Sequence, residues 1–173
     1  VQFMDGVMFM HSDRLVKIRE SLDDGETIGK LRRIATQFSF WAPEDFLTGN
    51  IRMHSDLEPL GCLGDLGWYN IRFNLWVMNY QMPHTVTGRL LNASGRSDSP
   101  RKVPTEFSGE MLFDGDVSAS FYCSFLTEHQ QWGHVSGTKG SIRIDDFVLP
   151  YYGNDIAYTV SQPVFDQTVC DFN

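Results

Sequence analysis

Three polar residues at helical spacing are the first candidates for chemistry in this sequence. Asp65, Tyr69 and Arg72 stand at positions i, i+4 and i+7, which share one face of a helix. The stretch from about Leu63 to Asn79 is otherwise apolar nearly all round, so we expect a buried helix. A buried carboxylate, phenol and guanidinium each need partners. The pattern therefore predicts either a hydrogen-bond network that ties the helix to its loops or a functional site.

Other common kinds of site find little support. No cysteine has a histidine beside it and no GxSxG motif is present, so nothing favours nucleophilic catalysis. His129 and His134 are five residues apart and would face opposite sides of a strand, and we predict no metal site. Gly61, Gly64 and Gly67 form GxxGxxG, which is not the dinucleotide fingerprint. By its own residues, the chain has no recognisable cofactor site.

The elements that would position this helix begin at the N-terminus. Residues 1–9 are predicted to form a buried strand, and Ser12 is a plausible N-cap for a helix that stops at Gly25. A strand is predicted from about Leu31 to Trp41, because Ile34, Thr36, Phe38 and Phe40 alternate with more polar residues. Residues 43–59 are expected to form a loop.

The second half of the chain is rich in strand signals. Asp114-Gly115 and Gly137-Thr138-Lys139-Gly140 are hairpin turns, and residues 92–104 are expected to form a mobile loop. The predicted strands are 85–91, 107–113, 117–126, 132–136, 141–145 and 157–160. Two helices followed by consecutive hairpins predict an α+β fold, with a predominantly antiparallel open sheet and helices packed on one face.

Composition narrows the class of protein. The chain has 173 residues, 42% of them hydrophobic, which suits one globular domain. Its net charge of −8 argues against nucleic acid or an anionic membrane as the main partner. No apolar run approaches the roughly 20 residues that a membrane span needs. Cys62, Cys123 and Cys170 lie far apart, which favours reduced thiols and a cytoplasmic protein.

The segment Leu60-Gly61-Cys62-Leu63-Gly64-Asp65-Leu66-Gly67-Trp68-Tyr69-Asn70 resembles a helix motif of the Gfo/Idh/MocA oxidoreductases. In that family a glycine-rich stretch leads to an Asp that is followed four residues later by His or Tyr. Asp65 and Tyr69 match those two positions. Asn50-Ile51-Arg52 together with Gly67-Trp68-Tyr69 is closest to the dihydrodiol-dehydrogenase-like branch.

Further resemblances follow in the same order along nearly the whole chain. They are the crossover segment 1–11, Gly29-Lys30-Leu31, the strand 117–125 ending in Cys-Ser-Phe, and the hairpin 137–140 followed by Ile142-Arg143-Ile144. The resemblance implies that residues 1–11 end a nucleotide domain or cross over from it. Residues 12–173 would form the substrate-binding and oligomerisation domain, as in glucose–fructose oxidoreductase-like proteins. An N-terminal Rossmann domain and a C-terminal helix would be missing.

The resemblance implies an NAD(P)-dependent oxidoreductase that transfers a hydride to or from a sugar, polyol or dihydrodiol. NAD or NADP would be bound mainly by the missing N-terminal domain, so the chain alone is expected to be inactive. Tyr69 would transfer the proton at the substrate oxygen. A free tyrosine has a pKa of ~10 and an adjacent carboxylate raises it, so Asp65 alone would be a poor helper. The lysine of the family's Glu-Lys-Pro motif, absent here, would then tune Tyr69.

Four further residues receive roles from the same resemblance. His11 would contact substrate or nicotinamide, unless it is a polar linker residue. Arg52 and Arg72 would bind substrate hydroxyls or an anionic group, although an ion pair with Asp65 is the favoured role for Arg72. Trp68 would form a wall of the pocket, or belong to the core as helix aromatics often do.

Partners and alternative functions complete the predictions. Ser118, Ser120, Tyr122 and Ser124 would line the open face of the sheet, through which members of the family commonly pair, so we expect a homodimer or higher oligomer. One alternative is a regulator of the same fold that senses sugar or nucleotide without chemistry. The other is a stand-alone carbohydrate-binding or assembly module, for which Trp132 and Tyr151-Tyr152 are candidate platforms, although Trp132 in a strand is expected to be core.

Overall fold

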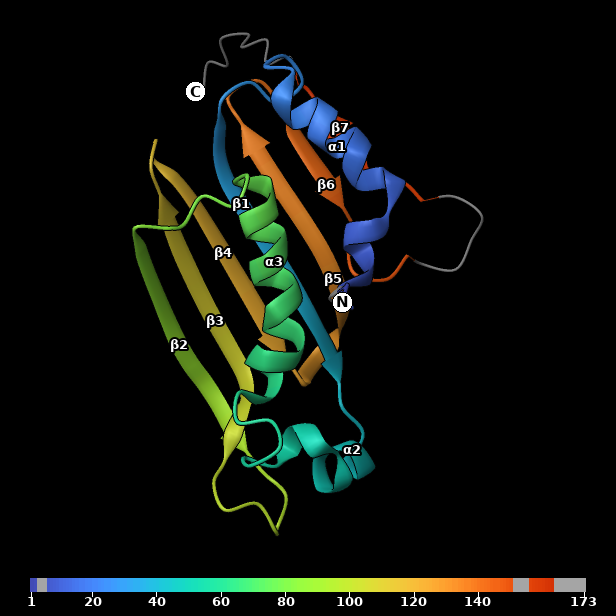
Figure 1. Cartoon of the computed structure of the whole chain (residues 1–173), viewed down its shortest axis with the longest axis vertical. Helices are drawn as coiled ribbons and strands as arrows, with labels where there is room; N and C mark the ends of the chain where they lie inside the picture. Colours follow the sequence, from blue (N-terminus) through green and yellow to red (C-terminus); the bar gives the residue numbers. More distant parts are fainter. Residues whose placement is uncertain (3–5, 151–155, 164–173) are drawn as a thin grey trace, which may run out of the picture.

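The computed structural model describes residues 1–2, 6–150 and 156–163, and these residues form a seven-stranded sheet with helices on one face (Figure 1). The strands are β1 (Leu31–Trp41), β2 (Thr85–Ser94), β3 (Val103–Phe113), β4 (Val117–Ser124), β5 (Leu126–Gly137), β6 (Ser141–Ile144) and β7 (Thr159–Ser161). They lie in the order β2-β3-β4-β1-β5-β6-β7, and neighbours are antiparallel except for the parallel pair β1 and β4. The predicted α+β fold with a mostly antiparallel open sheet is confirmed.

The core lies between the sheet and two helices, α1 (Asp13–Asp23) and α3 (Trp68–Val77), which Figure 1 shows on the same face. In β1 the predicted alternation holds, because Ile34, Thr36 and Phe38 are buried beneath α3. On β5, Gly133 lets the helix approach the sheet closely, since a Cβ there would come within 3.2 Å of the Phe73 ring. Ser12 caps α1 as predicted by accepting a hydrogen bond from the backbone of Arg14.

Both predicted hairpins are confirmed. β3 and β4 pair through Phe113 and Val117, and the turn between them contains Gly115 and Asp116, both with positive φ. β5 and β6 pair around the turn that starts at Gly137. Gly115 and Asp116 take the left-handed conformation that a tight turn requires, and glycine adopts it at no steric cost, so Gly115 is the part of the Asp114-Gly115 signal that forms this turn.

The prediction of an N-terminal strand is wrong for the described part of residues 1–9. No strand includes residues 1–2 or 6–7, and the following residues form the 3₁₀ helix η1 (Met8–His11); residues 3–5 lie outside the described residues. The run is apolar because Val7 and Phe9 pack into the core, where the Phe9 ring meets Phe147 and Phe73. Burial alternates between Val7, Met8 and Phe9 as it does in a strand, which explains why the sequence pattern predicts a strand here.

Residues 43–59 are not the simple loop that was predicted. They contain α2 (Glu44–Gly49) and the 3₁₀ helix η2 (Ile51–Met53). Glu44 and Asp45 lie in the first turn of α2, where negative charge is favourable. Phe46 anchors the helix by packing on the rings of Phe40 and Phe125, at centroid distances of 5.4 and 5.1 Å.

The predicted loop at 92–104 is shorter in the structure. β2 runs on to Ser94 and β3 already begins at Val103, so residues 95–102 remain as the connection. The predicted last strand, 157–160, is β7 at Thr159–Ser161.

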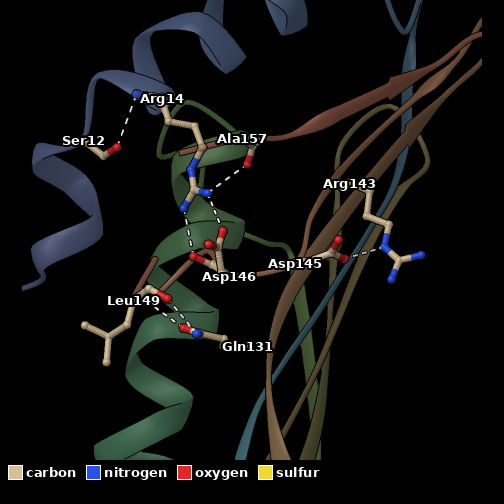
Figure 2. A network of polar contacts seen from close by, with 8 residues as sticks. All are labelled: Ser12, Arg14, Gln131, Arg143, Asp145, Asp146, Leu149 and Ala157. Carbon is tan, nitrogen blue, oxygen red and sulfur yellow. Dashed lines mark hydrogen bonds and ion pairs between the residues drawn. The ribbon is translucent and has the colours of Figure 1, made fainter. Parts of the chain in front are cut away.

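A buried ion pair joins α1 to the chain after β6 (Figure 2). The Arg14 guanidinium contacts Asp146 Oδ1 at 2.5 Å and also donates to the backbone oxygens of Asp146 and Ala157. Both side chains are nearly buried, with 4% and 12% of their surfaces exposed. Beside them, the Gln131 side chain exchanges two hydrogen bonds with the backbone of Leu149. These contacts fix the segment after β6 beneath α1.

We expect Arg14→Met to lower the free energy of unfolding by about 3 kcal/mol or more, because it removes the Arg14 guanidinium from the nearly buried Asp146 carboxylate. The double variant Arg14→Met/Asp146→Leu should recover part of that loss, since it removes both charges. Urea unfolding of the wild type and both variants measures this. A loss below about 1 kcal/mol for Arg14→Met would show that the pair does not hold the segment.

Candidate functional site

The candidate site is built on a turn of π-helix, η3 (Leu63–Gly67), which runs directly into α3. The predicted helix at 63–79 is therefore present, with a wider first turn than the sequence pattern indicates. π-turns inside helices occur frequently at functional sites. This one carries Asp65, and the first turn of α3 carries Trp68 and Tyr69.

Close packing against the sheet fixes the π-turn in place. A Cβ added at Gly67 would come within 2.8 Å of Leu63 Cδ1 and 3.3 Å of the Cys123 sulfur on β4. Gly61 has a φ of +48°, and a Cβ there would meet the Pro104 carbonyl oxygen at 2.2 Å. The protein's own atoms thus occupy the space that these glycines leave, and the glycines serve packing rather than the binding of a phosphate.

Two buried thiols lie under the turn. Cys62 directly precedes η3, and its sulfur lies 3.9 Å from that of Cys123 and 3.6 Å from the Cys123 carbonyl oxygen. The hydrogen bond with Cys62, together with burial, raises the pKa of the Cys123 thiol far above its ordinary value. A thiol of this kind is a poor nucleophile, so the pair contributes packing to the site rather than reactivity.

An ion pair joins the π-turn to the segment after α2. Arg52 Nε lies 2.6 Å from Asp65 Oδ1, and the two side chains are 39% and 20% exposed. Asn50 caps η2 by accepting a hydrogen bond from the backbone of Arg52, which helps to orient this residue. Arg52 was predicted to bind substrate, and the structure gives it Asp65 as its charged partner.

Tyr69 stands beside this ion pair, half-buried between aromatic rings. Its ring meets Phe38 of β1 edge-on at 5.5 Å and lies 6.4 Å from Phe9. Burial raises the pKa of Tyr69, the Asp65 carboxylate raises it further, and the Arg52 guanidinium lowers it. The phenol therefore holds its proton firmly at neutral pH, and the charges of Asp65 and Arg52 act on it in opposite directions.

Three further residues were predicted to belong to the site: Trp68, Arg72 and His11. Trp68 is 49% exposed and does not belong to the core. Arg72, whose favoured partner was Asp65, places its guanidinium over the Tyr80 ring at 5.2 Å. His11 is exposed at the end of η1 and lines a cavity with Phe147 and Tyr158. The structure thus brings Asp65, Tyr69 and Arg52 together, with Trp68 next to Tyr69 in the chain, and it gives Arg72 a contact with Tyr80 and His11 a place in the lining of a cavity.

Several features of the site were not predicted. Phe9 and Phe38 form its aromatic walls; the strand alternation of β1, which puts Phe38 on the helix-facing side, was a usable signal for the second. The buried face of α3 includes Asn70, whose side chain donates to the carbonyl oxygens of Leu66 and Tyr122. The helix is therefore not apolar on its inner face, and its outer face exposes Trp68.

Of the aromatic residues considered as sugar-binding platforms, the structure describes Trp132. Trp132 was expected to be core, but it is only half-buried and donates from its indole to Gln130. Tyr151 and Tyr152 lie outside the described residues.

In the described part of the chain, no group of three or more His, Cys, Asp or Glu is arranged to hold a metal ion. Of the helices that the structure describes, none is long and apolar enough to cross a membrane.

Solved structures share this fold. An aldose–aldose oxidoreductase from Caulobacter crescentus, complexed with glycerol, matches with a TM-score of 0.74 and 19% identity over 96% of this chain. KijD10, a 3-ketoreductase from Actinomadura kijaniata in complex with NADP and TDP-benzene, matches with a TM-score of 0.69 and 19% identity over 94% of the chain. A levoglucosan dehydrogenase in complex with NADH and levoglucosan has a TM-score of 0.63 and 16% identity over 73%. The matches cover 49%, 50% and 35% of those proteins, so this chain spans half of their length or less.

The sequence also matches a family model. The model of the GFO/IDH/MocA C-terminal domain covers residues 15–143, which is most of the chain and includes the π-turn, α3, strands β1 to β5 and most of β6. The resemblance inferred from the Asp65–Tyr69 motif is confirmed: the chain belongs to the Gfo/Idh/MocA family and contains its C-terminal domain.

Proposed function

We propose that this chain is the substrate-side domain of an NAD(P)-dependent oxidoreductase that acts on the carbinol carbon of a sugar, polyol or dihydrodiol. The observation that carries the proposal is the half-buried Tyr69 phenol beside the Arg52–Asp65 ion pair. Membership of an oxidoreductase family supports it, as do solved structures of the same fold that hold NADP or NADH.

In this proposal Tyr69 moves the proton at the substrate oxygen. Reduction of a carbonyl requires a proton donor at the oxygen, and burial together with Asp65 keeps the Tyr69 phenol protonated. In the opposite direction the phenol must lose its proton, which the raised pKa disfavours. The positive charge of Arg52 lowers the pKa of Tyr69 and so offsets part of this effect. A lysine ammonium supplied by the N-terminal domain would lower the pKa further.

The other residues of the site suit a polyhydroxylated ligand. Arg52 and Asp65 are both partly exposed and can exchange hydrogen bonds with hydroxyl groups. The exposed Trp68 offers an apolar surface next to them, as a wall against which the ring of a sugar or dihydrodiol can lie. A carbinol oxygen bound at Tyr69 would then have its neighbouring hydroxyls near the ion pair.

The residues of this domain do not fit the phosphates of a dinucleotide. The glycine run at 61, 64 and 67 is filled by Pro104, Glu58, Leu60, Leu63 and Cys123, which leaves no cradle for a pyrophosphate. We propose that the nucleotide is held by a Rossmann domain that precedes residue 12, and that residues 12–173 supply the substrate and assembly surfaces. The nicotinamide, when bound, gives or accepts the hydride.

We also propose that the open face of the sheet forms a homodimer or higher oligomer. On β4, Ser118, Ser120 and Tyr122 point away from the helices and remain partly exposed, and Arg33 donates hydrogen bonds to both serine hydroxyls. Ser124, predicted to share this face, is buried, and its hydroxyl accepts a hydrogen bond from the backbone of Leu126.

The free buried thiols Cys62 and Cys123 suit the reducing cytoplasm, where we expect the protein to act.

We expect Tyr69→Phe in the full-length protein to lower kcat by about 10²–10⁴-fold, because it removes the proton-transfer group. Nucleotide affinity should stay nearly unchanged, since Tyr69 lies on the substrate side. Steady-state turnover with a panel of sugars, polyols and dihydrodiols, together with NADH and NADPH titrations, measures both. Turnover near the wild-type rate would show that Tyr69 does not transfer the proton.

For the assembly surface, we expect Ser120→Arg to dissociate the oligomer, because it places a second cation beside Arg33 at the centre of the open face. Light scattering coupled to size-exclusion chromatography gives the mass. The control is Ser21→Arg, which adds the same charge on α1, away from the open face, and should leave the mass unchanged. A Ser120→Arg protein of wild-type mass would locate the interface elsewhere.

A further inference from the structure

The connection between β2 and β3 packs against the segment that carries Arg52. The two segments are far apart in sequence: residues 49–55 begin at the last residue of α2, and residues 95–102 join β2 to β3. Figure 1 shows the β2–β3 connection at the same end of the sheet as α2. We refer to residues 95–102 as the β2–β3 loop and to residues 49–55 as the Arg52 segment.

Three hydrogen bonds hold the Arg52 segment on the C-terminal side of Arg52. The backbone of Arg96 donates to the Met53 carbonyl oxygen at 2.9 Å, and the backbone of Ser55 donates to Ser99 Oγ at 2.9 Å. The backbone of Arg101 donates to Ser55 Oγ at 3.2 Å. Met53 and Ser55 are buried, so these bonds are partly shielded from water.

A side chain of the same loop holds the segment on the other side of Arg52. Arg96 Nη1 donates to the Gly49 carbonyl oxygen at 3.1 Å. The guanidinium is kept in this orientation by Asp98, whose carboxylate oxygens bind its Nε at 2.9 Å and its Nη2 at 2.5 Å. The hydrogen bond from Arg96 lowers the pKa of Asp98, so this carboxylate stays ionised and in place. Two parallel bonds of this kind fix an arginine geometrically.

The ion pair with Asp65 cannot by itself fix Arg52. Pairs between partly exposed groups contribute only about 0–1 kcal/mol, because water solvates and screens both charges. An arginine side chain that is ordered in one orientation also loses up to about 2 kcal/mol of conformational freedom. When the backbone is held on both sides of Arg52, less conformational freedom remains to be lost when Arg52 pairs with Asp65.

We propose that the β2–β3 loop positions Arg52 against Asp65, and that Arg96 and Ser99 are positioning residues for the reaction at Tyr69. The inference rests on the proposed function, because it assigns a purpose to the placement of Arg52 in that site. Arg96 and Ser99 themselves touch neither Tyr69 nor Asp65 among the contacts of the described residues; they act through the backbone of residues 49–55.

The test uses the full-length protein and the pKa of Tyr69, which NMR of ¹³C-labelled tyrosine measures and a Tyr69→Phe variant assigns. Asp65 and Arg52 are the charged groups that act on Tyr69. Arg52→Gln should raise the pKa of Tyr69. Arg96→Gln and Ser99→Ala should each raise it in the same direction, and Arg52→Gln/Arg96→Gln should give the value of Arg52→Gln alone. Ser99→Ala is a small change in a surface loop and guards against misfolding of the Arg96 variant.

The matched control is Arg101→Gln. It removes a positive charge from the same loop and retains the backbone N–H that binds Ser55, so the pKa of Tyr69 should stay at the wild-type value. In kinetic assays, kcat/KM of the Arg96→Gln protein should fall by up to about 100-fold, as misplacement of a site group by about 1 Å can cause. The kcat/KM of Arg101→Gln should not change.

The inference is overturned if Arg52→Gln raises the pKa of Tyr69 while both loop variants leave it at the wild-type value. It is equally overturned if Arg52→Gln has no effect, or if the effects of Arg52→Gln and Arg96→Gln add. Because the pKa is measured without turnover, a protein that oxidises or reduces none of the tested substrates would contradict the proposed function and still decide the role of the loop.

Discussion

The close contact between the π-turn and β4 is the constraint on which the rest of the site depends. Gly67 has no side chain, and Leu63 and the Cys123 sulfur occupy the space that one would need. Cys62 continues this contact one turn earlier. The start of α3 is thereby held against β4, where Tyr69 packs on Phe38 of β1 and Asp65 pairs with Arg52. A side chain at Gly67 would displace the π-turn, and with it Asp65 and Tyr69, although no polar residue of the site had been replaced.

On this support, the chemistry of the site depends on a balance between two opposite charges. Asp65 raises the pKa of Tyr69 and Arg52 lowers it, while the rings of Phe9 and Phe38 reduce the access of water to the phenol. Burial is the main cause of the raised pKa of Tyr69, and the charges of Asp65 and Arg52 act on that pKa in opposite directions.

The sequence predicts those parts of the structure that local chemistry decides. The Asp-Gly turn, the alternation in β1 and the Ser12 cap are local, and each is confirmed. The ion pair of Asp65 was assigned to Arg72 on helical spacing, whereas a wider π-turn and the fold of residues 49–55 bring Arg52 there instead. The apolar run at 1–9 has the burial pattern of a strand at Val7, Met8 and Phe9, but Met8 and Phe9 already belong to the 3₁₀ helix η1. Contacts between distant segments, such as those of the β2–β3 loop, leave no pattern that periodicity can detect.

The central claim is that Tyr69 transfers the proton, with a pKa that burial and the Asp65 carboxylate raise. The most direct measurement compares the pKa of Tyr69 with the pH at which turnover in the reductive direction declines on the alkaline side, in the full-length wild type and in Asp65→Asn. Removal of the carboxylate charge should lower the pKa of Tyr69, and the alkaline decline should move to lower pH with it. A decline that stays in place while the pKa of Tyr69 falls would contradict the claim, because the proton would then come from another group.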